Sequence, residues 1–167
     1  VENARTLNQI ANSWLGKMSM GASYLWSRSG PLSMAPSQFG IFTKSSPEIE
    51  TPDLEYHIQP LSTDKLGDPL HPYPAVTVSV CNLRPDSRGS THISSDGPSA
   101  HPHISPRYLS ASRDIDVALR ALRQARELMT MPALKKYAPR EDLPGADIMD
   151  DADLARAAGD IGTTIFH

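Results

Sequence analysis

Fifteen prolines, set beside ten glycines, divide this 167-residue chain into short segments. Proline cannot continue a helix or pair within a central strand, and glycine tolerates the backbone conformations of tight turns. The sequence therefore favours turns and short extended segments over a helical bundle. Hydrophobic residues make up 39% of the chain, which is enough apolar material for the core of one domain.

The segment 6–28 has the apolar spacing of an amphipathic helix, with hydrophobic residues three and four positions apart. It predicts a helix in two parts joined near Gly16. Trp14 and Trp26 are expected to pack this helix against a sheet.

A second helix is predicted over residues 112–129, with one apolar stripe. The rest of its surface is expected to be a solvated charged face, formed by Arg113, Asp116, Arg120, Arg123, Arg126 and Glu127. Shorter helices are expected over 132–137 and 150–158, the last one capped by Asp150.

The strand signals are short and separated by turns. Alternating or β-branched residues occur in four segments, 39–43, 54–59, 75–83 and 90–94. The turn at 84–89 predicts a β-hairpin between the last two segments. Together with the helices, this pattern predicts an α+β fold, a mostly antiparallel β-sheet with helices packed on one side.

The charge and cysteine counts exclude several classes of function. The formal net charge is −3, so no overall basic field would hold a nucleic acid. A single cysteine excludes an internal disulfide framework and any multi-cysteine metal cluster. No apolar run approaches the roughly 18–20 residues that span a bilayer, so no transmembrane segment is expected.

The sequence contains no glycine-rich loop that would bind a phosphate group. Gly159 and Gly162 lie close together, but no third glycine and no strand accompany them, so they do not form a dinucleotide fingerprint. No cofactor-binding residue is therefore assigned within this chain. His101 and His103 lie in a proline-rich loop without other ligands at a suitable spacing, and no metal site is expected.

Two residues within the predicted strands have reactive side chains. His57 lies in the middle of the 54–59 strand, where the residue pattern favours the polar face of a half-buried strand. Cys81 lies in the 75–83 strand and is expected to be a small apolar residue rather than a nucleophile. The residues by themselves indicate a soluble α+β domain and no particular reaction.

Five strings, taken in order, resemble the substrate-binding domain of the glucose-methanol-choline (GMC) flavoprotein oxidoreductases. Within that family they are most similar to the bacterial choline dehydrogenases and related alcohol dehydrogenases. The strings extend over nearly the whole chain: Gly30-Pro-Leu-Ser-Met-Ala-Pro-Ser with the Gly40-x-Phe42 strand, Pro52-Asp-Leu-Glu-Tyr-His-Ile-Gln-Pro60, Leu83-Arg-Pro-Asp-Ser-Arg-Gly89, Pro102-x-Ile104-x-Pro106-x-Tyr108-Leu-Ser110 with Asp114 after it, and Gly162-Thr-Thr-Ile-Phe-His167.

The resemblance implies that residues 1–167 are a fragment of a larger FAD enzyme, whose FAD-binding Rossmann domain and C-terminal end lie outside this chain. In the family, the C-terminal signature supplies a catalytic histidine, and His167 occupies its position. Glu55, Tyr56 and His57 are expected to line or back the sheet face over which the substrate lies.

The implied enzyme is an FAD-dependent dehydrogenase that oxidises a primary alcohol, choline or another, to the aldehyde and passes electrons to an acceptor. Proton abstraction accompanies hydride transfer to the flavin, and the isolated fragment is expected to bind no FAD and to be inactive. The alternative is a stand-alone ligand-binding or interaction domain without redox activity. The expected location is cytoplasmic, with peripheral membrane association of the parent left open.

Overall fold

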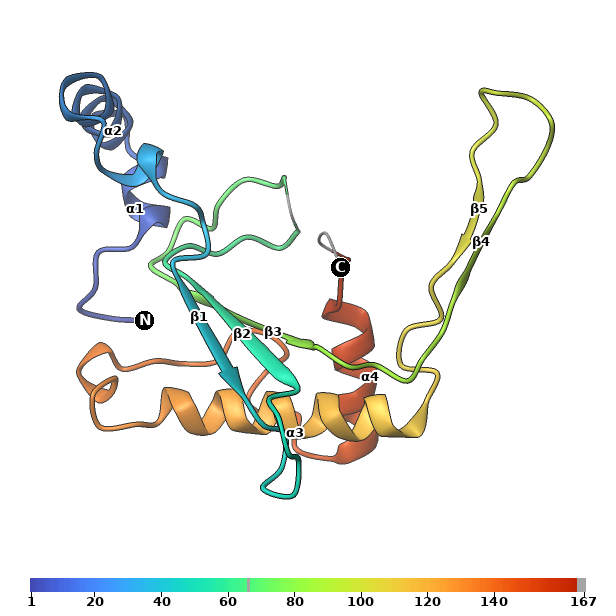
Figure 1. The fold of residues 1–167 in the computed structure, drawn as a ribbon. Coiled ribbons are helices and arrows are strands. Elements are labelled where there is room, and N and C mark those ends of the chain that lie inside the picture. Colours follow the sequence, from blue (N-terminus) through green and yellow to red (C-terminus); the bar gives the residue numbers. More distant parts are fainter. Residues whose placement is uncertain (66, 165–167) are drawn as a thin grey trace.

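A computed structural model describes residues 1–65 and 67–164, and Figure 1 shows its arrangement. Its centre is a three-stranded antiparallel sheet in the order β1-β2-β3, formed by Phe39–Thr43, Leu54–Gln59 and Thr77–Asn82. The first two strands have the predicted bounds, and the third is shorter than predicted. The sheet and its helices confirm the predicted α+β class.

Helix α3, Ser112–Met129, has the predicted bounds and covers one face of the sheet. Its inward residues Val117 and Ala121 form the core with Leu54 and Tyr56 of β2. Strand residues that pair across the sheet lie on the same face, so Ile41 and Val80, the partners of Tyr56, join this core. Burying each large side chain of this cluster stabilises the fold by roughly 1.5–3 kcal/mol.

The predicted hairpin between the third and fourth strand segments is wrong. The strand β3 pairs with β2, whereas β4 (Ser90–His92) pairs with β5 (His103–Ser105) in a separate two-stranded sheet. These two short strands form an arm that projects from the body of the molecule (Figure 1). The connection predicted over 95–106 therefore contains a strand at its end.

The turn between β3 and this arm is held by one buried carboxylate, Asp114 in the first turn of α3. Its Oδ1 accepts from the backbone N–H of Asp86 at 2.8 Å and its Oδ2 from that of Ser87 at 2.7 Å. The side-chain amide of Asn82 donates to Oδ1 at 3.3 Å. Burial works to raise the pKa of Asp114, but the hydrogen bonds from Ser87 and Asp86, with the charge of Arg113, hold this pKa below its usual value.

The first helical segment is divided as predicted, three residues earlier than expected. Helix α1, Leu7–Asn12, ends at Ser13, which caps α2, Trp14–Ser27, through a hydrogen bond from the N–H of Gly16. Gly16 allows the two helices to meet, because a Cβ at this position would lie 2.1 Å from the carbonyl oxygen of Ile10.

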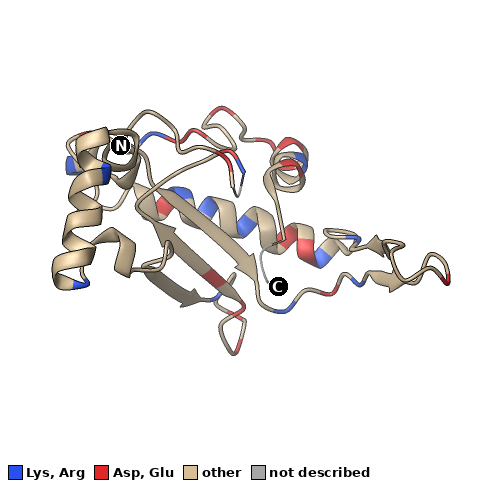
Figure 2. Ribbon diagram, turned by 90° about the horizontal axis from the view of Figure 1, so that it is seen from above, with Lys and Arg blue, Asp and Glu red and all other residues tan. Residues whose placement is uncertain are grey.

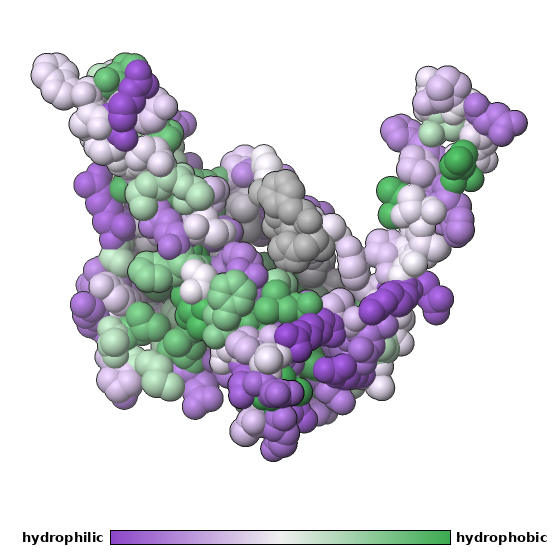
Figure 3. Space-filling view, viewed as in Figure 1, coloured by the Kyte–Doolittle hydropathy of each residue, from purple (hydrophilic) through white to green (hydrophobic). Residues whose placement is uncertain are grey.

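The expectation that Trp14 and Trp26 pack this helix against the sheet is wrong. Trp14 is 72% exposed and Trp26 is 95% exposed. Helix α2 projects from the body of the molecule on the side away from the β4–β5 arm (Figures 1 and 3). A short 3-10 helix, η1 (Pro31–Ser33), follows it and leads to β1.

The C-terminal third packs on α3. Helix α4, Asp151–Ile161, is capped by Asp150 as predicted and is three residues longer than expected; its Leu154 is fully buried. The short helix predicted over 132–137 is present only as the 3-10 turn η2, Lys135–Tyr137. Among the described residues, no helix has the length and apolar character to cross a membrane.

Arg126 does not belong to a solvated face, contrary to the prediction. Its side chain is only 20% exposed and forms a two-pronged ion pair with Glu141, with Nε–Oε2 and Nη2–Oε1 distances of 2.8 and 2.9 Å. The same guanidinium donates to the carbonyl oxygens of Gly145 and Ile148. One arginine of α3 therefore fixes the loop that precedes α4.

Candidate functional site

The two faces of strand β2 have different surroundings, because successive side chains of a strand point to opposite sides. Tyr56 points to the core beneath the sheet, whereas Glu55 and His57 point to the other face. Their strand partners on that face are Gly40 and Phe42 of β1 and Ser79 and Cys81 of β3. We call the face with Glu55, His57 and Cys81 the open face of the sheet.

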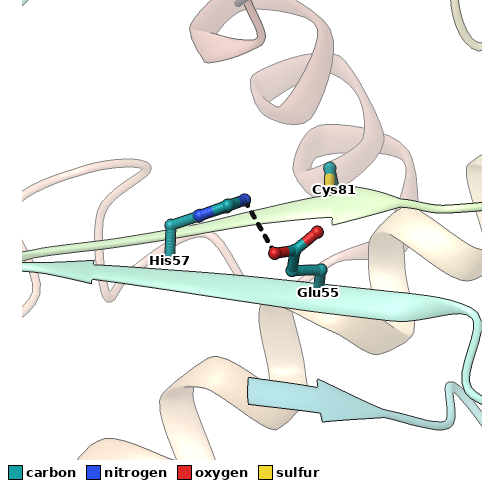
Figure 4. Close-up of side chains that lie close together, drawn as sticks. All are labelled: Glu55, His57 and Cys81. Atoms are coloured by element: carbon teal, nitrogen blue, oxygen red, sulfur yellow. Dashed lines mark ion pairs between the residues drawn. The ribbon is translucent and has the colours of Figure 1, made fainter. Parts of the chain in front are cut away.

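Three side chains with reactive atoms meet on the open face, as Figure 4 shows. The Nε2 atom of His57 lies 3.5 Å from Oε1 of Glu55. Cys81 is the direct cross-strand partner of Glu55. Both Glu55 and His57 are half-buried, with side chains 21% and 29% exposed, and the Nε2 atom of His57, which faces Glu55, is itself buried.

The environment of Cys81 does not activate its thiol. Burial, followed by the negative charge of Glu55, raises the pKa of Cys81 above its usual value. The thiol therefore stays protonated at neutral pH, and the expectation that it is no nucleophile stays a prediction. The chain places it half-buried rather than in the core.

The same three residues are the group that could hold a metal ion. They offer one carboxylate oxygen, one imidazole nitrogen and one sulfur, all within 4.8 Å of one another. This is a ligand set that zinc accepts, although three ligands leave its fourth position open. The expectation of no metal stays a prediction.

Tyr56 lies apart from the other two residues predicted to contact the substrate. It is 2% exposed, and its hydroxyl is 2.8 Å from the carbonyl oxygen of Ala121 and 2.9 Å from Oε1 of Gln124. Burial raises its pKa to about 12, so the phenol stays neutral. Tyr56 fixes β2 to α3 from beneath, while Glu55 and His57 face outward.

Two cavities border the described residues, and neither is lined by Glu55 or His57. One, of about 540 Å³, lies on the core side of the sheet, where Ile58 and Val78 contact the N-terminal residues. The other, of about 670 Å³, lies over the turn with Pro85 and Arg113.

The segment with Gly159 and Gly162 has no geometry for binding phosphate. Both residues lie at the carboxyl end of α4, where carbonyl groups rather than N–H groups are exposed. The expectation that this chain contributes no cofactor-binding residue stays a prediction. The predicted catalytic residue His167 lies outside the described residues.

Sequence reasoning missed the position of Cys81 beside Glu55. The pairing register of β2 and β3 creates this contact, and alternation within one strand does not contain it. The separation of Tyr56 from its neighbours, in contrast, follows from alternation alone.

Two solved structures that share this fold are named as oxidases. The chain aligns over its whole length with 34% of a formate oxidase variant from Aspergillus oryzae RIB40 studied for FAD modification, with a TM-score of 0.85 and 18% identity. It also aligns over 75% of its length with 25% of pyridoxine 4-oxidase from Mesorbium loti, with a TM-score of 0.63 and 21% identity. The fold is the one that these two oxidases contain.

Sequence relatives point in the same direction. The chain is 31% identical over 166 residues to an alcohol dehydrogenase [acceptor] of Pseudomonas putida, covering 99% of the chain and 30% of that enzyme. It is 31% identical over 154 residues to an oxygen-dependent choline dehydrogenase of Klebsiella pneumoniae, covering 92% of the chain and 28% of that enzyme. Residues 85–167 match the family model described as GMC oxidoreductase. The chain belongs to the GMC oxidoreductase family, and it spans about three tenths of the length of these relatives.

Proposed function

We propose that the chain is the substrate-binding portion of an FAD-dependent alcohol dehydrogenase, with choline or another primary alcohol as substrate. The open face of the sheet would form one wall of the substrate site. The observation that supports this most strongly is the half-buried pair of Glu55 and His57, 3.5 Å apart on the open face. The opposite wall would come from chain outside residues 1–167.

FAD would be held mainly by that other part of the enzyme, since the Gly159–Gly162 segment lies at the carboxyl end of α4 and does not present the N–H groups that bind a phosphate. When bound, FAD supplies the acceptor for the hydride that leaves the alcohol carbon. By itself, the 167-residue chain would bind no FAD and oxidise no alcohol. A flavin absorption spectrum of the purified chain tests this point, and stoichiometric flavin would contradict it.

His57 and Glu55 are proposed to bind and orient the alcohol. An imidazole can donate or accept a hydrogen bond with the substrate hydroxyl, and the carboxylate of Glu55 beside it fixes the ring and favours a cationic group nearby. The rigidity of β2, tied to α3 through Tyr56, would keep both groups at a constant distance from the reacting carbon. Positioning of this kind affects both substrate affinity and turnover.

His167 is proposed to be the acid/base that takes the hydroxyl proton as the carbon–hydrogen bond breaks. A histidine near its ordinary pKa exchanges a proton readily at neutral pH. In the longer enzyme that contains this chain, His167→Ala should lower kcat by roughly 10²–10⁴-fold. His57→Gln should lower kcat/KM by about tenfold or more, the cost of one hydrogen bond to the reacting group.

The matched control for both variants is His92→Gln, since His92 lies exposed on the β4–β5 arm. Steady-state kinetics with an artificial electron acceptor should give control values within about twofold of the unaltered enzyme, as expected for an exposed surface site. Near-normal turnover of His167→Ala would reject the acid/base role. Equal effects of His57→Gln and His92→Gln would reject the open face as part of the substrate site.

A further inference from the structure

The outer surface of α2 is an unbroken apolar face. With 100° of rotation per residue, six of its residues fall within about 120° of the helix circumference: Trp14, Leu15, Met18, Ala22, Leu25 and Trp26. We call the five large members, without Ala22, the α2 apolar face. Each of them is more than half exposed, from 53% for Met18 to 95% for Trp26.

The opposite side of α2 shows why this face points outward. Gly16 lies on that side and contacts α1 at the carbonyl of Ile10. The helix therefore contacts α1 through Gly16 and leaves its largest apolar side chains toward solvent. An exposed contiguous patch of this kind marks an interaction surface more often than a free surface.

The sequence segment that contains α2 has a net charge opposite in sign to that of the rest of the chain. Residues 3–47 contain four basic side chains, Arg5, Lys17, Arg28 and Lys44, and no acidic one. That segment carries +4, while the remaining residues together carry −7. Lys17 and Arg28 lie on or next to α2, and Figure 2 shows blue segments on the ribbon of this helix.

We propose that the α2 apolar face docks on an anionic membrane surface. A helix that lies in the plane of such an interface combines Trp and Leu on one side with Lys or Arg at its borders. Tryptophan in particular is enriched at the boundary between headgroups and acyl chains. The basic segment 3–47 supplies attraction to anionic lipids that the acidic remainder of the chain lacks.

The charge pattern favours lipid over the other possible occupants of this face. A second copy of the chain would place two basic segments against each other. The remainder of a longer enzyme could cover the face with apolar residues, but it would not require a segment of 45 residues without one acidic side chain. This inference does not depend on the proposed alcohol oxidation.

The two tryptophans of the chain, both on this face, provide the measurement. Vesicles of phosphatidylglycerol and phosphatidylcholine should shift the tryptophan fluorescence to shorter wavelength and sediment with the protein. Vesicles of phosphatidylcholine alone should bind it more weakly, and added salt should weaken the binding to anionic vesicles. Trp26→Ser should reduce the partition coefficient on the order of tenfold, which corresponds to the burial of one large side chain.

A negative charge placed on the α2 apolar face, with a matched control on the β4–β5 arm, separates loss of docking from misfolding. Leu25→Glu should abolish vesicle binding, whereas Ile93→Glu, at a site 87% exposed on the β4–β5 arm, should leave it unchanged. Both variants should keep the far-ultraviolet circular dichroism of the original chain. Absence of binding to anionic vesicles, or equal binding by Leu25→Glu, would overturn the proposal.

The competing occupants give distinct results. A dimer in solution that Leu25→Glu dissociates would overturn lipid docking in favour of a second copy. In the longer protein, protection of Trp14 and Trp26 from a water-soluble quencher in the absence of lipid would assign the face to an internal contact. If the quencher reaches both tryptophans without lipid and no longer reaches them once anionic vesicles are added, the result would support membrane docking.

Discussion

Replacement of Asp114 tests how much one buried carboxylate contributes to the free energy of unfolding of this chain. Asp114→Asn keeps the size of the side chain and removes its charge. One of its two oxygens becomes an NH₂ group, so either the N–H of Asp86 or that of Ser87 loses its acceptor. The carboxylate is 4% exposed, so water cannot easily replace the lost partner.

The expected cost follows from these contacts. Losing one hydrogen bond to a charged acceptor and leaving one buried N–H unsatisfied costs about 2–4 kcal/mol of the free energy of unfolding. With a urea dependence of about 2 kcal/mol per molar, the unfolding midpoint should fall by about 1–2 M. Circular dichroism during urea titration measures this shift. Asp116→Asn, an exposed neighbour on the same helix, is the matched control and should change stability by less than about 0.5 kcal/mol.

The pH dependence gives the same prediction a second test. The pKa of Asp114 in the folded chain lies below its usual value, so its contribution is complete above the unfolded pKa of about 3.9. That contribution is lost as pH falls through the folded pKa, where the protonated carboxyl resembles the amide. The stability difference between the original chain and Asp114→Asn should therefore shrink in acid. A difference that grows in acid, or a neutral-pH effect no larger than that of Asp116→Asn, would refute the account.

Two other substitutions test contacts of the helices. Arg126→Lys keeps the charge but cannot form the two-pronged pair with Glu141. It should therefore lower the free energy of unfolding, measured by urea titration, by about 1.5–3 kcal/mol. A change within experimental error would show that the charge alone is sufficient. Gly16→Ala should lower the thermal midpoint, because its methyl group would meet the carbonyl of Ile10, although helix propensity alone favours alanine by about 1 kcal/mol; a raised midpoint would contradict the close contact of α1 and α2.

The sequence predicted most helices and strands correctly, but it did not predict which strands pair or what the helices contact. Alternation placed the strand at 54–59 and the apolar stripe placed α3, since both signals are local. The pairing of β3 with β2 was missed, because Asp114, far along the chain, holds the turn that sends residues 84–89 away from the sheet. The residue pattern within one segment does not indicate a contact with a residue so far along the chain.

Local pattern also fails to predict the exposure of side chains that are covered by residues distant in the sequence. Periodicity identifies Trp14 and Trp26 as members of one helix face but does not tell what covers that face. Arg126 has the spacing of a solvated residue, yet Glu141 and two carbonyl groups of a later loop enclose it. For the candidate site, alternation separates Tyr56 from Glu55 and His57, while the register of the sheet adds Cys81.

The adjacency of Tyr56 and His57 in β2 links the core beneath the sheet directly to the residues of the open face. One peptide bond separates a phenol anchored to the backbone of α3 from an imidazole on the opposite surface. No hinge lies between them, so a change in the volume of Val117 or Ala121 would displace β2 and tilt His57 with it. Under the proposed function, the position of His57 relative to an alcohol would therefore depend on core residues such as Val117 and Ala121, which lie on the far side of the sheet from the open face.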